Sequence, residues 1–361
     1  MAVPPAVPPT DRADLRRRID QVLAGFLRQR RRWLLAVDDE ALRPVAAALE
    51  AFVLGGGKRL RPAFGYWGYR GGGGADSPAV VSALAALELV QASALIHDDL
   101  MDGSDTRRGE PSIHRRFAGQ HRRNGWRGAP DGFGAAAAVL LGDLCLVWSD
   151  ELLHDAGLDA GALRRARPVF DEMRTEVTVG QFLDVHAQYA GDTSVERASQ
   201  VARYKSAKYT VERPLLLGAA LAGAPQSISV GYSGYGLALG EAFQLRDDVL
   251  GVFGDPARTG KPAGDDLREG KRTYLVASAY RATGDTGRAL LDARLGDPTL
   301  DETGIDQVRE VIVASGALAA TEARIADLTE RALAALVPVD IEPEARQVLR
   351  DLAVAATTRA G

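Results

Sequence analysis

The sequence predicts an all-α fold built from antiparallel helices, with a binding cavity between them. Alanine and leucine abound, aromatic residues make up 6% of the chain, and β-branched runs are short, a balance that favours helices. Apolar residues recur at helical spacing along most of the chain, and turns suited to β-hairpins are nearly absent. Successive helices are therefore expected to pack as antiparallel neighbours whose facing side chains line the cavity.

Length and composition indicate a single large helical domain over residues 13–361, preceded by a disordered Pro-rich tail over residues 1–12. With 46% hydrophobic residues the chain can bury a large core. The net charge of -4 gives no support to binding of nucleic acid or of a membrane surface. The single cysteine, Cys145, excludes an internal disulfide framework and a Cys-rich metal site.

The hydropathy of the chain predicts a cytoplasmic protein. No stretch approaches ~20 uninterrupted apolar residues, so we expect no transmembrane segment. The first residues, "MAVPPAVPPTDR", lack the apolar core of a secretory signal.

The first half of the chain contains the clearest helix signals. Amphipathic segments over 11–37 and 38–55 stop at the breaker "GGG", and a helix over 58–70 stops at "GGGG". Ser77 as N-cap and Pro78 in the first turn begin a long apolar helix over 77–102.

The second half continues the same pattern. A polar, Gly-rich loop is expected over 119–134 and another loop over 255–272. Helices are expected between and around these loops, over 135–157, 163–190, 194–224 and 233–254, with about three more from residue 273 onward.

Two acidic clusters each follow a long apolar run with helical spacing. "HDDLMD" places Asp98, Asp99 and Asp102 on one side of a helix, and "FQLRDD" adds Asp247 and Asp248. If the helices face one another, these carboxylates converge and repel unless cations lie among them. Oxygen-only ligands select hard ions, Mg²⁺ or Mn²⁺. Solvated helix ends are the alternative, but the preceding apolar runs place both pairs at the edge of the core.

Basic residues elsewhere indicate what such a metal would bind. Carboxylates, Mg²⁺ and several cations together describe a site for a highly charged anion, most simply a diphosphate. "GGGKRL" lacks the preceding strand and the spacing of a nucleotide P-loop, which excludes that motif. The cations in question are Lys58, Arg59, Arg61, Arg107, Arg108, Lys205, Lys208 and Lys261.

These motifs together resemble the trans-isoprenyl diphosphate synthases, or polyprenyl synthetases, over roughly residues 45 to 280. "GGGKRLRP", "DDLMD", "RRG", "GQFLD", "KSAKYT", "FQLRDD" and "TGKP" occur in the order that the family shows. The resemblance implies an all-α domain around a deep central cavity, usually in a homodimer. It implies condensation of isopentenyl diphosphate with an allylic diphosphate on about three Mg²⁺ ions, for which Mn²⁺ can substitute.

The resemblance also implies roles for individual residues. Metal ions would be held by both acidic motifs, through Asp98, Asp99, Asp102, Asp247 and Asp248. The allylic diphosphate would be gripped by Arg107, Lys205 and Lys261. Isopentenyl diphosphate would be bound by Lys58, Arg61, Gln91 and Arg108. The reacting centre would be lined by Gln181, Asp184, Ser206 and Gln244.

The chain departs from the family pattern in the second acidic motif. Gly251 stands where the family has a third acid, and Asp255, one turn further on, either reaches a metal through water or caps a turn. Asp265 and Asp266 are expected to be loop acids that order Lys271 or help to close the site. Ser206 replaces the family's more common threonine and keeps the hydroxyl.

The residues before the first motif bear on product length. Ser93 and Ala94 are small, whereas short-chain members of the family commonly carry an aromatic plug there. We therefore expect geranylgeranyl diphosphate, with longer polyprenyl products open. Three other functions stay open: a terpene cyclase or lyase on the same fold, an inactive subunit of a heteromeric synthase, and a structural metal-binding protein.

Overall fold

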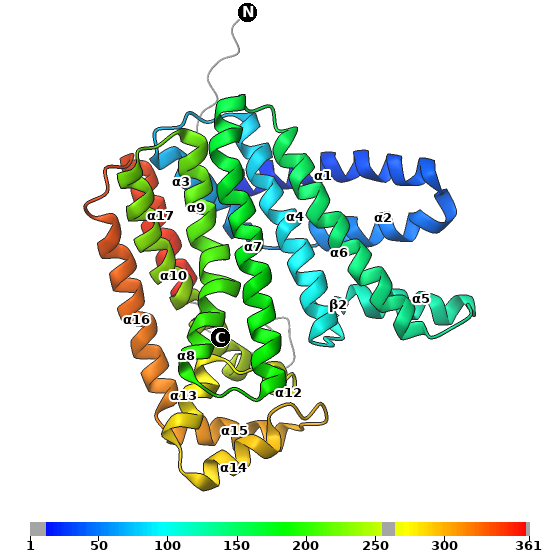
Figure 1. Cartoon of the computed structure of the whole chain (residues 1–361), viewed down its shortest axis with the longest axis vertical. Coiled ribbons are helices and arrows are strands. Elements are labelled where there is room, and N and C mark those ends of the chain that lie inside the picture. Colours follow the sequence, from blue (N-terminus) through cyan, green and yellow to red (C-terminus); the bar gives the residue numbers. More distant parts are fainter. Residues whose placement is uncertain (1–11, 255–263, 359–361) are drawn as a thin grey trace, which may run out of the picture.

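The computed structural model describes residues 12–254 and 264–358 and has the all-α architecture that the sequence predicts (Figure 1). Long helices run side by side along the longest axis of the molecule, and the hairpin of α1 (Arg12–Val37) and α2 (Asp39–Leu54) projects to one side. The other elements of the first half are α3 (Leu60–Gly71), α4 (Pro78–Met101), β1 (Thr106–Arg107), β2 (Glu110–Pro111), α5 (Ile113–Asn124), α6 (Pro130–His154) and α7 (Ala160–Ala190).

The second half brings further long helices against the first and closes one end of the bundle. Helices α13, α14 and α15 lie at the lower end of the molecule in Figure 1. The elements are α8 (Val195–Val201), the π-helix η1 (Ala202–Glu212), α9 (Arg213–Ala222), α10 (Gln226–Phe253), α12 (Asp265–Arg268), α13 (Tyr274–Ala282), α14 (Asp285–Arg294), α15 (Glu302–Ala314), α16 (Ala317–Leu336) and α17 (Pro343–Thr357).

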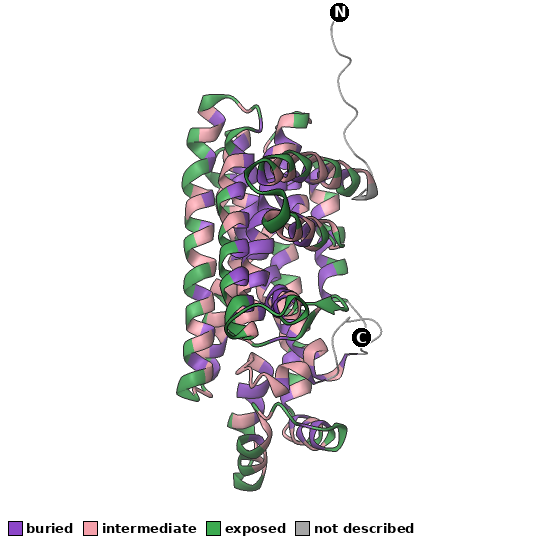
Figure 2. Cartoon of the chain, turned by 90° about the vertical axis from the view of Figure 1, so that its right-hand side faces the viewer, coloured by how far each residue is buried: buried purple, intermediate pink, exposed green. Residues whose placement is uncertain are grey.

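Helix α4 lies at the centre of the core and begins as the sequence predicts. The Ser77 hydroxyl accepts a hydrogen bond from the Val80 backbone N–H at 3.3 Å, and Pro78 occupies the first turn. Most of its residues are buried, because the helix packs on neighbours on several sides. Figure 2 shows that buried residues gather in the interior of the helix bundle. A helix that is apolar nearly all round is the kind that a core can bury.

Several predicted boundaries were wrong. The loop expected over 119–134 is shorter, because α5 continues to Asn124 and α6 begins at Pro130. Gly125, with φ of 60°, ends α5, and Pro130 suits the first turn of α6. Helix α3 begins at Leu60 rather than at residue 58, since Arg59 has a left-handed backbone. Five helices, α13 to α17, follow residue 273 where about three were expected.

Two helices of the described residues are long and apolar enough to span a membrane, by length and composition alone. They are α4 and α6. Since α4 is mostly buried among other helices, its apolar character is accounted for by the core. Helix α6 instead leaves an apolar side exposed, at Val139, Leu140 and Val147.

Arg59, grouped with the anion-binding cations in the sequence, is instead a buried part of the core. Its guanidinium contacts Glu88 Oε2 at 2.6 Å, Asp20 Oδ1 at 2.8 Å and the Val53 carbonyl at 2.8 Å. Glu88 is itself buried, so its charge depends on this arginine.

Arg59→Ala should lower the free energy of unfolding by about 3–5 kcal/mol, because it leaves the Glu88 carboxylate buried without its cation. Urea denaturation measures the loss. Arg43→Ala is the matched control, since Arg43 pairs with Asp39 on the exposed surface and should cost less than about 1 kcal/mol. Equal effects of the two changes would show that the buried pair is not important for stability.

Candidate active site

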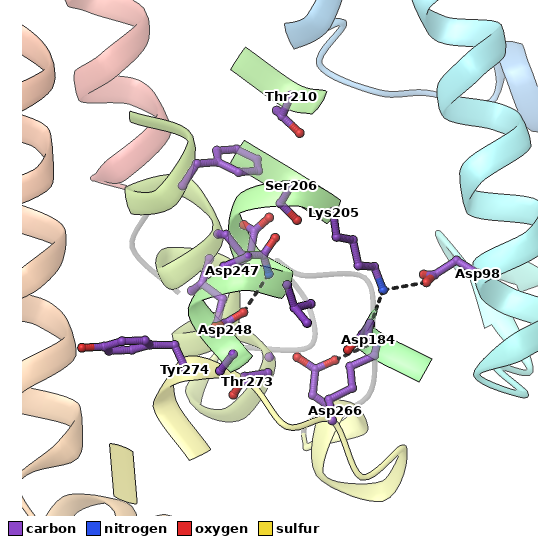
Figure 3. A pocket seen from close by; sticks show the side chains of 18 of the residues that line it. Asp98, Asp184, Lys205, Ser206, Thr210, Asp247, Asp248, Asp266, Thr273 and Tyr274 are labelled. Carbon is purple, nitrogen blue, oxygen red and sulfur yellow. Dashed lines mark hydrogen bonds and ion pairs between the residues drawn. The ribbon is translucent and has the colours of Figure 1, made fainter. Parts of the chain in front are cut away.

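The two acidic motifs face a common cavity of about 660 Å³ between α4, η1, α10 and the segment that holds α12 (Figure 3). Asp98 projects from α4 toward Lys205 of η1, while Asp247 and Asp248 approach from α10. The sequence-predicted residues that line the cavity are Lys58, Arg61, Gln91, Asp98, Arg107, Asp184, Lys205, Ser206, Gln244, Asp247 and Asp248.

In the first motif, Asp98 is held in its ionised form by cations from other parts of the chain. Lys205 Nζ lies 2.9 Å from Asp98 Oδ1, and Arg107 Nη2 lies 3.6 Å from Oδ2. Burial alone would raise the pKa of Asp98, but Lys205, Lys271 and Arg107 together lower it well below its usual range. This carboxylate therefore carries a negative charge at any physiological pH.

Asp99 belongs to the same motif but is not among the residues that line the cavity. It is fully buried and accepts a hydrogen bond from Arg107 Nε at 2.9 Å. Its contact is therefore with the guanidinium that also approaches Asp98. In this geometry Asp99 positions Arg107 on the cavity wall.

Asp102, the third acid of the motif, pairs with Lys271. The Lys271 ammonium lies 3.0 Å from Asp102 Oδ2 and 2.6 Å from Glu269 Oε2. Burial raises the pKa of Asp102 to about 6, against the opposing charge of Lys271. Within the described ranges, Asp102 Oδ1 is buried and accepts no hydrogen bond.

The second motif places one of its acids, Asp248, in a buried position without a cation among its described contacts. Asp248 is buried on α10 and accepts a hydrogen bond from Gln244 Nε2 at 2.7 Å. Burial raises the pKa of Asp248 to about 7, and the charges of Asp266 and Asp247 act in the same direction.

The π-helix η1 supplies the wall that faces α4. Lys205 Nζ bridges Asp98 and Asp184, with the second contact at 2.6 Å (Figure 3). Ser206 and Thr210 place hydroxyl groups on the same cavity. π-Helical turns are frequent at functional sites, because they alter which side chains share a face.

Tyr209 and Thr210 of η1, to which the sequence assigned no role, connect the predicted site residues Arg61 and Gln91. Arg61 donates to the Thr210 hydroxyl at 2.8 Å, and its guanidinium stacks 4.2 Å from the centre of the Tyr209 ring. The Tyr209 hydroxyl donates to Gln91 Oε1 at 2.8 Å. Stacking and hydrogen bonding hold the guanidinium in one orientation, which suits recognition of a phosphate.

Other predicted site residues lie outside the cavity lining. Arg108 donates to the Gly56 carbonyl at 2.9 Å, and Gln181 is half-buried on α7. Ser93 is buried and Ala94 half-buried on α4. Lys261 and Asp255 fall outside the described residues, so their predicted roles stay predictions.

Lys271 and Asp266 line the cavity, although the sequence predicted only supporting roles for them. The signal that could have found them is the run "GDDLREGK", in which acids and a lysine follow the second motif closely. Thr210, the last residue of the "KSAKYT" motif, also lines the cavity, although the sequence assigned it no role. Thr273 and Tyr274 line the cavity too and gave no sequence signal.

The donor set suits Mg²⁺, as the sequence predicts. Nowhere in the parts of the chain that the structure describes do three acidic, histidine or cysteine side chains form a ready metal cage. Mg²⁺ commonly uses only one or two carboxylates and completes its shell with water and substrate phosphates. Asp98 and Asp247 offer carboxylates from opposite sides of the cavity. Asp102 Oδ1 is a buried oxygen that accepts no hydrogen bond within the described ranges, although Asp102 does not line the cavity. Cations and carboxylates around one cavity can thus bind a diphosphate with its metal ions.

Comparison with known proteins agrees with this geometry. Residues 43–312 match the family model described as polyprenyl synthetase. The chain resembles the crystal structure of geranylgeranyl pyrophosphate synthase from Corynebacterium glutamicum complexed with isoprenyl diphosphate and magnesium. The TM-score is 0.94 with 42% identity, covering 97% of this chain and 100% of that one.

The relatives of this chain are named for different products. The geranylfarnesyl diphosphate synthase of Aeropyrum pernix is 33% identical over 300 residues, 81% of this chain and 87% of the relative. The (2E,6E)-farnesyl diphosphate synthase of Mycobacterium tuberculosis is 33% identical over 264 residues, 72% of this chain and 68% of the relative. Similarity alone therefore leaves the chain length of the product open.

The raised pKa of Asp248 predicts how metal-free stability depends on pH. A carboxyl that binds its proton more tightly when folded contributes stability that is present at low pH and is lost as the pH rises through about 7. Asp248→Asn keeps the shape without the ionisation. With chelator present, the variant should unfold at a higher temperature than the wild type at pH near 8. The difference should shrink as the pH falls and vanish near the ordinary carboxyl pKa of 3.8.

Asp285→Asn is the control for this measurement, because Asp285 is fully exposed on α14 and should leave the pH profile unchanged. A metal-free Asp248→Asn protein that is less stable than the wild type at pH 8 would contradict the assignment.

Proposed function

The chain belongs to the polyprenyl synthetase family, and on that premise we propose that it elongates an allylic diphosphate with isopentenyl diphosphate, mainly to geranylgeranyl diphosphate. The allylic substrate is dimethylallyl, geranyl or farnesyl diphosphate. The observation that carries the proposal is the convergence of both acidic motifs and several cations on one cavity. A single-diphosphate enzyme would not need cations at both Arg61 and Lys205.

The first task of the site is to let a diphosphate leave. Mg²⁺ bound with the diphosphate neutralises its charge and makes it a better leaving group. Arg107 and Lys205 are positioned to hold the same anion, because Asp99 and Asp184 fix their charged ends. We assign to Lys58, Arg61 and Gln91 the binding of isopentenyl diphosphate, since all three line the cavity.

The second task is to stabilise the allylic cation that remains. The Ser206 hydroxyl and the Gln244 carbonyl oxygen can point dipoles at positive charge from η1 and α10. The alkene of isopentenyl diphosphate then attacks the cation, and a proton leaves to the departed diphosphate. Water must be excluded, because hydrolysis is the competing reaction.

Product length depends on how far the growing chain can run along α4. At about 100° per residue, Ala94 lies within about 40° of Asp98 on the helix, whereas Ser93 lies about 140° away. Ala94 therefore lies nearer than Ser93 to the face of α4 that carries Asp98, although neither residue lines the cavity itself. We infer that a large side chain at position 94 would be the one to obstruct the growing tail. The small side chain there supports a product longer than the fifteen-carbon farnesyl diphosphate.

The proposed reaction is tested by incubating the protein with Mg²⁺, isopentenyl diphosphate and each allylic diphosphate, followed by chromatography of the products. Geranylgeranyl diphosphate is expected. A longer prenyl diphosphate would revise the chain length only. A cyclised hydrocarbon from one substrate would indicate a lyase, and activity that needs a second protein would indicate an inactive subunit.

In the same assay, Ala94→Phe should shift the main product from twenty carbons to fifteen or fewer, because the ring blocks the tail. Ser93→Phe should also shorten the product, by a smaller shift, if the packing around it allows the ring to reach the tail. Leu349→Phe, at a buried residue of α17, is the control for general loss of packing. An unchanged product from both α4 variants would show that residues 93 and 94 do not limit the length of the product.

We further propose a homodimer that covers the exposed apolar side of α6. Leu140 and Val147, about two turns apart on one face, are 62% and 63% exposed, and Phe182 of α7 is 67% exposed. Apolar side chains gathered on one face mark an interaction surface.

A cytoplasmic location is a further proposal. It is supported by the burial of α4, whose apolar residues pack inside the protein.

Replacing both Leu140 and Val147 with Glu should convert a dimer to a monomer, because charges would be buried in the interface. Light scattering after size-exclusion chromatography measures the mass. Val313→Glu, on the exposed side of α15, is the control and should leave the mass unchanged. A dimeric double variant would place the interface elsewhere.

A further inference from the structure

Gly251 leaves a gap in the second acidic motif, and the carboxylate of Asp266 occupies it. Residue 251 follows Asp247 and Asp248 by four and three positions, so all three share one side of α10. A Cβ atom at residue 251 would lie 1.9 Å from Asp266 Oδ2 and 2.7 Å from its Cγ. No side chain fits at residue 251 while Asp266 stays in place.

Asp266 also belongs to the cavity that both motifs line. It lies on α12, and the view in Figure 3 shows it below Asp248 and Asp184, on the cavity side. Lys271 Nζ lies 3.6 Å from Asp266 Oδ1 and 3.0 Å from Asp102 Oδ2. The Lys271 ammonium thus lies between Asp266 of α12 and Asp102 of the first acidic motif.

On the premise of the proposed prenyl transfer, we propose that Asp266 supplies the carboxylate that Gly251 lacks. In this assignment Asp266 orients the divalent cation on the α10 side of the cavity, directly or through a bound water molecule. Gly251 and Asp266 then form a matched pair, in which the missing side chain makes room for a carboxylate from another helix.

A purely structural role is the alternative, in which Asp266 only holds Lys271 in place. The two roles predict different effects of Asp266→Asn on metal affinity when Lys271 is also replaced. If Asp266 acts only through Lys271, then Asp266→Asn has no further effect once Lys271→Met is present. If it acts on the metal, the asparagine variant loses affinity in either background.

The experiment measures binding of Mn²⁺ in the presence of inorganic pyrophosphate, by electron paramagnetic resonance of the free ion. Asp266→Asn should weaken the Mn²⁺ affinity by about tenfold or more, with and without Lys271→Met, since lost support around a metal costs about 10–100-fold. Circular dichroism checks that each variant is folded. An affinity equal to the wild type, or a loss only when Lys271 is present, would overturn the proposal.

A rescue tests the matched pair itself. Gly251→Asp alone should weaken Mn²⁺ binding, because the new side chain collides with Asp266. Gly251→Asp combined with Asp266→Ala should return the affinity to within about threefold of the wild type. A double variant no better than Asp266→Ala alone would show that the two positions do not substitute for each other.

These measurements separate the two proposals. A protein that makes prenyl diphosphates while Asp266→Asn binds Mn²⁺ normally would keep the proposed function and lose this inference. A protein without prenyl transfer whose Mn²⁺ affinity depends on Asp266 would lose the function and keep the inference.

Discussion

The mutual repulsion of buried carboxylates is the constraint on which the rest of the structure depends. Each acid of the first motif has a cation from a different part of the chain. Lys205 comes from η1, Arg107 from the β1–β2 hairpin and Lys271 from the segment after α12. Because a buried charge without a partner is costly, these pairs hold the separate elements against α4. The same residues that would bind substrate therefore also assemble the cavity.

The acids of the site are not equivalent, and the difference follows from their surroundings. Lysine and arginine keep Asp98 ionised, whereas burial raises the pKa values of Asp102 and Asp248 toward neutrality. A divalent cation that replaced a proton at the latter two would relieve the cost of ionisation there. The site thus combines fixed negative charge with carboxyls whose ionisation a metal ion favours.

Patterns that are local in sequence were predictable, and contacts between distant segments were not. The cap of α4 at Ser77 and the facing acidic motifs follow from spacing and residue type. The burial of Arg59 beside Glu88 depends on a helix 29 positions further along the chain. The carboxylate of Asp266 over Gly251 likewise arises only when α12 folds back onto α10. The sequence near these residues does not predict either contact, because a charged residue in a buried ion pair and one in a binding site have the same local sequence pattern.

The π-helix η1 keeps two functional groups of the wall in phase. Its hydrogen bonds join residues five apart, so Lys205 and Thr210 lie one turn from each other and both line the cavity. An ordinary α-helix of the same sequence would rotate Thr210, and with it the contact to Arg61, away from the ammonium of Lys205. The wider turn thus lets two cavity-lining groups five residues apart share one face, whereas in an α-helix that face is shared by residues three or four apart.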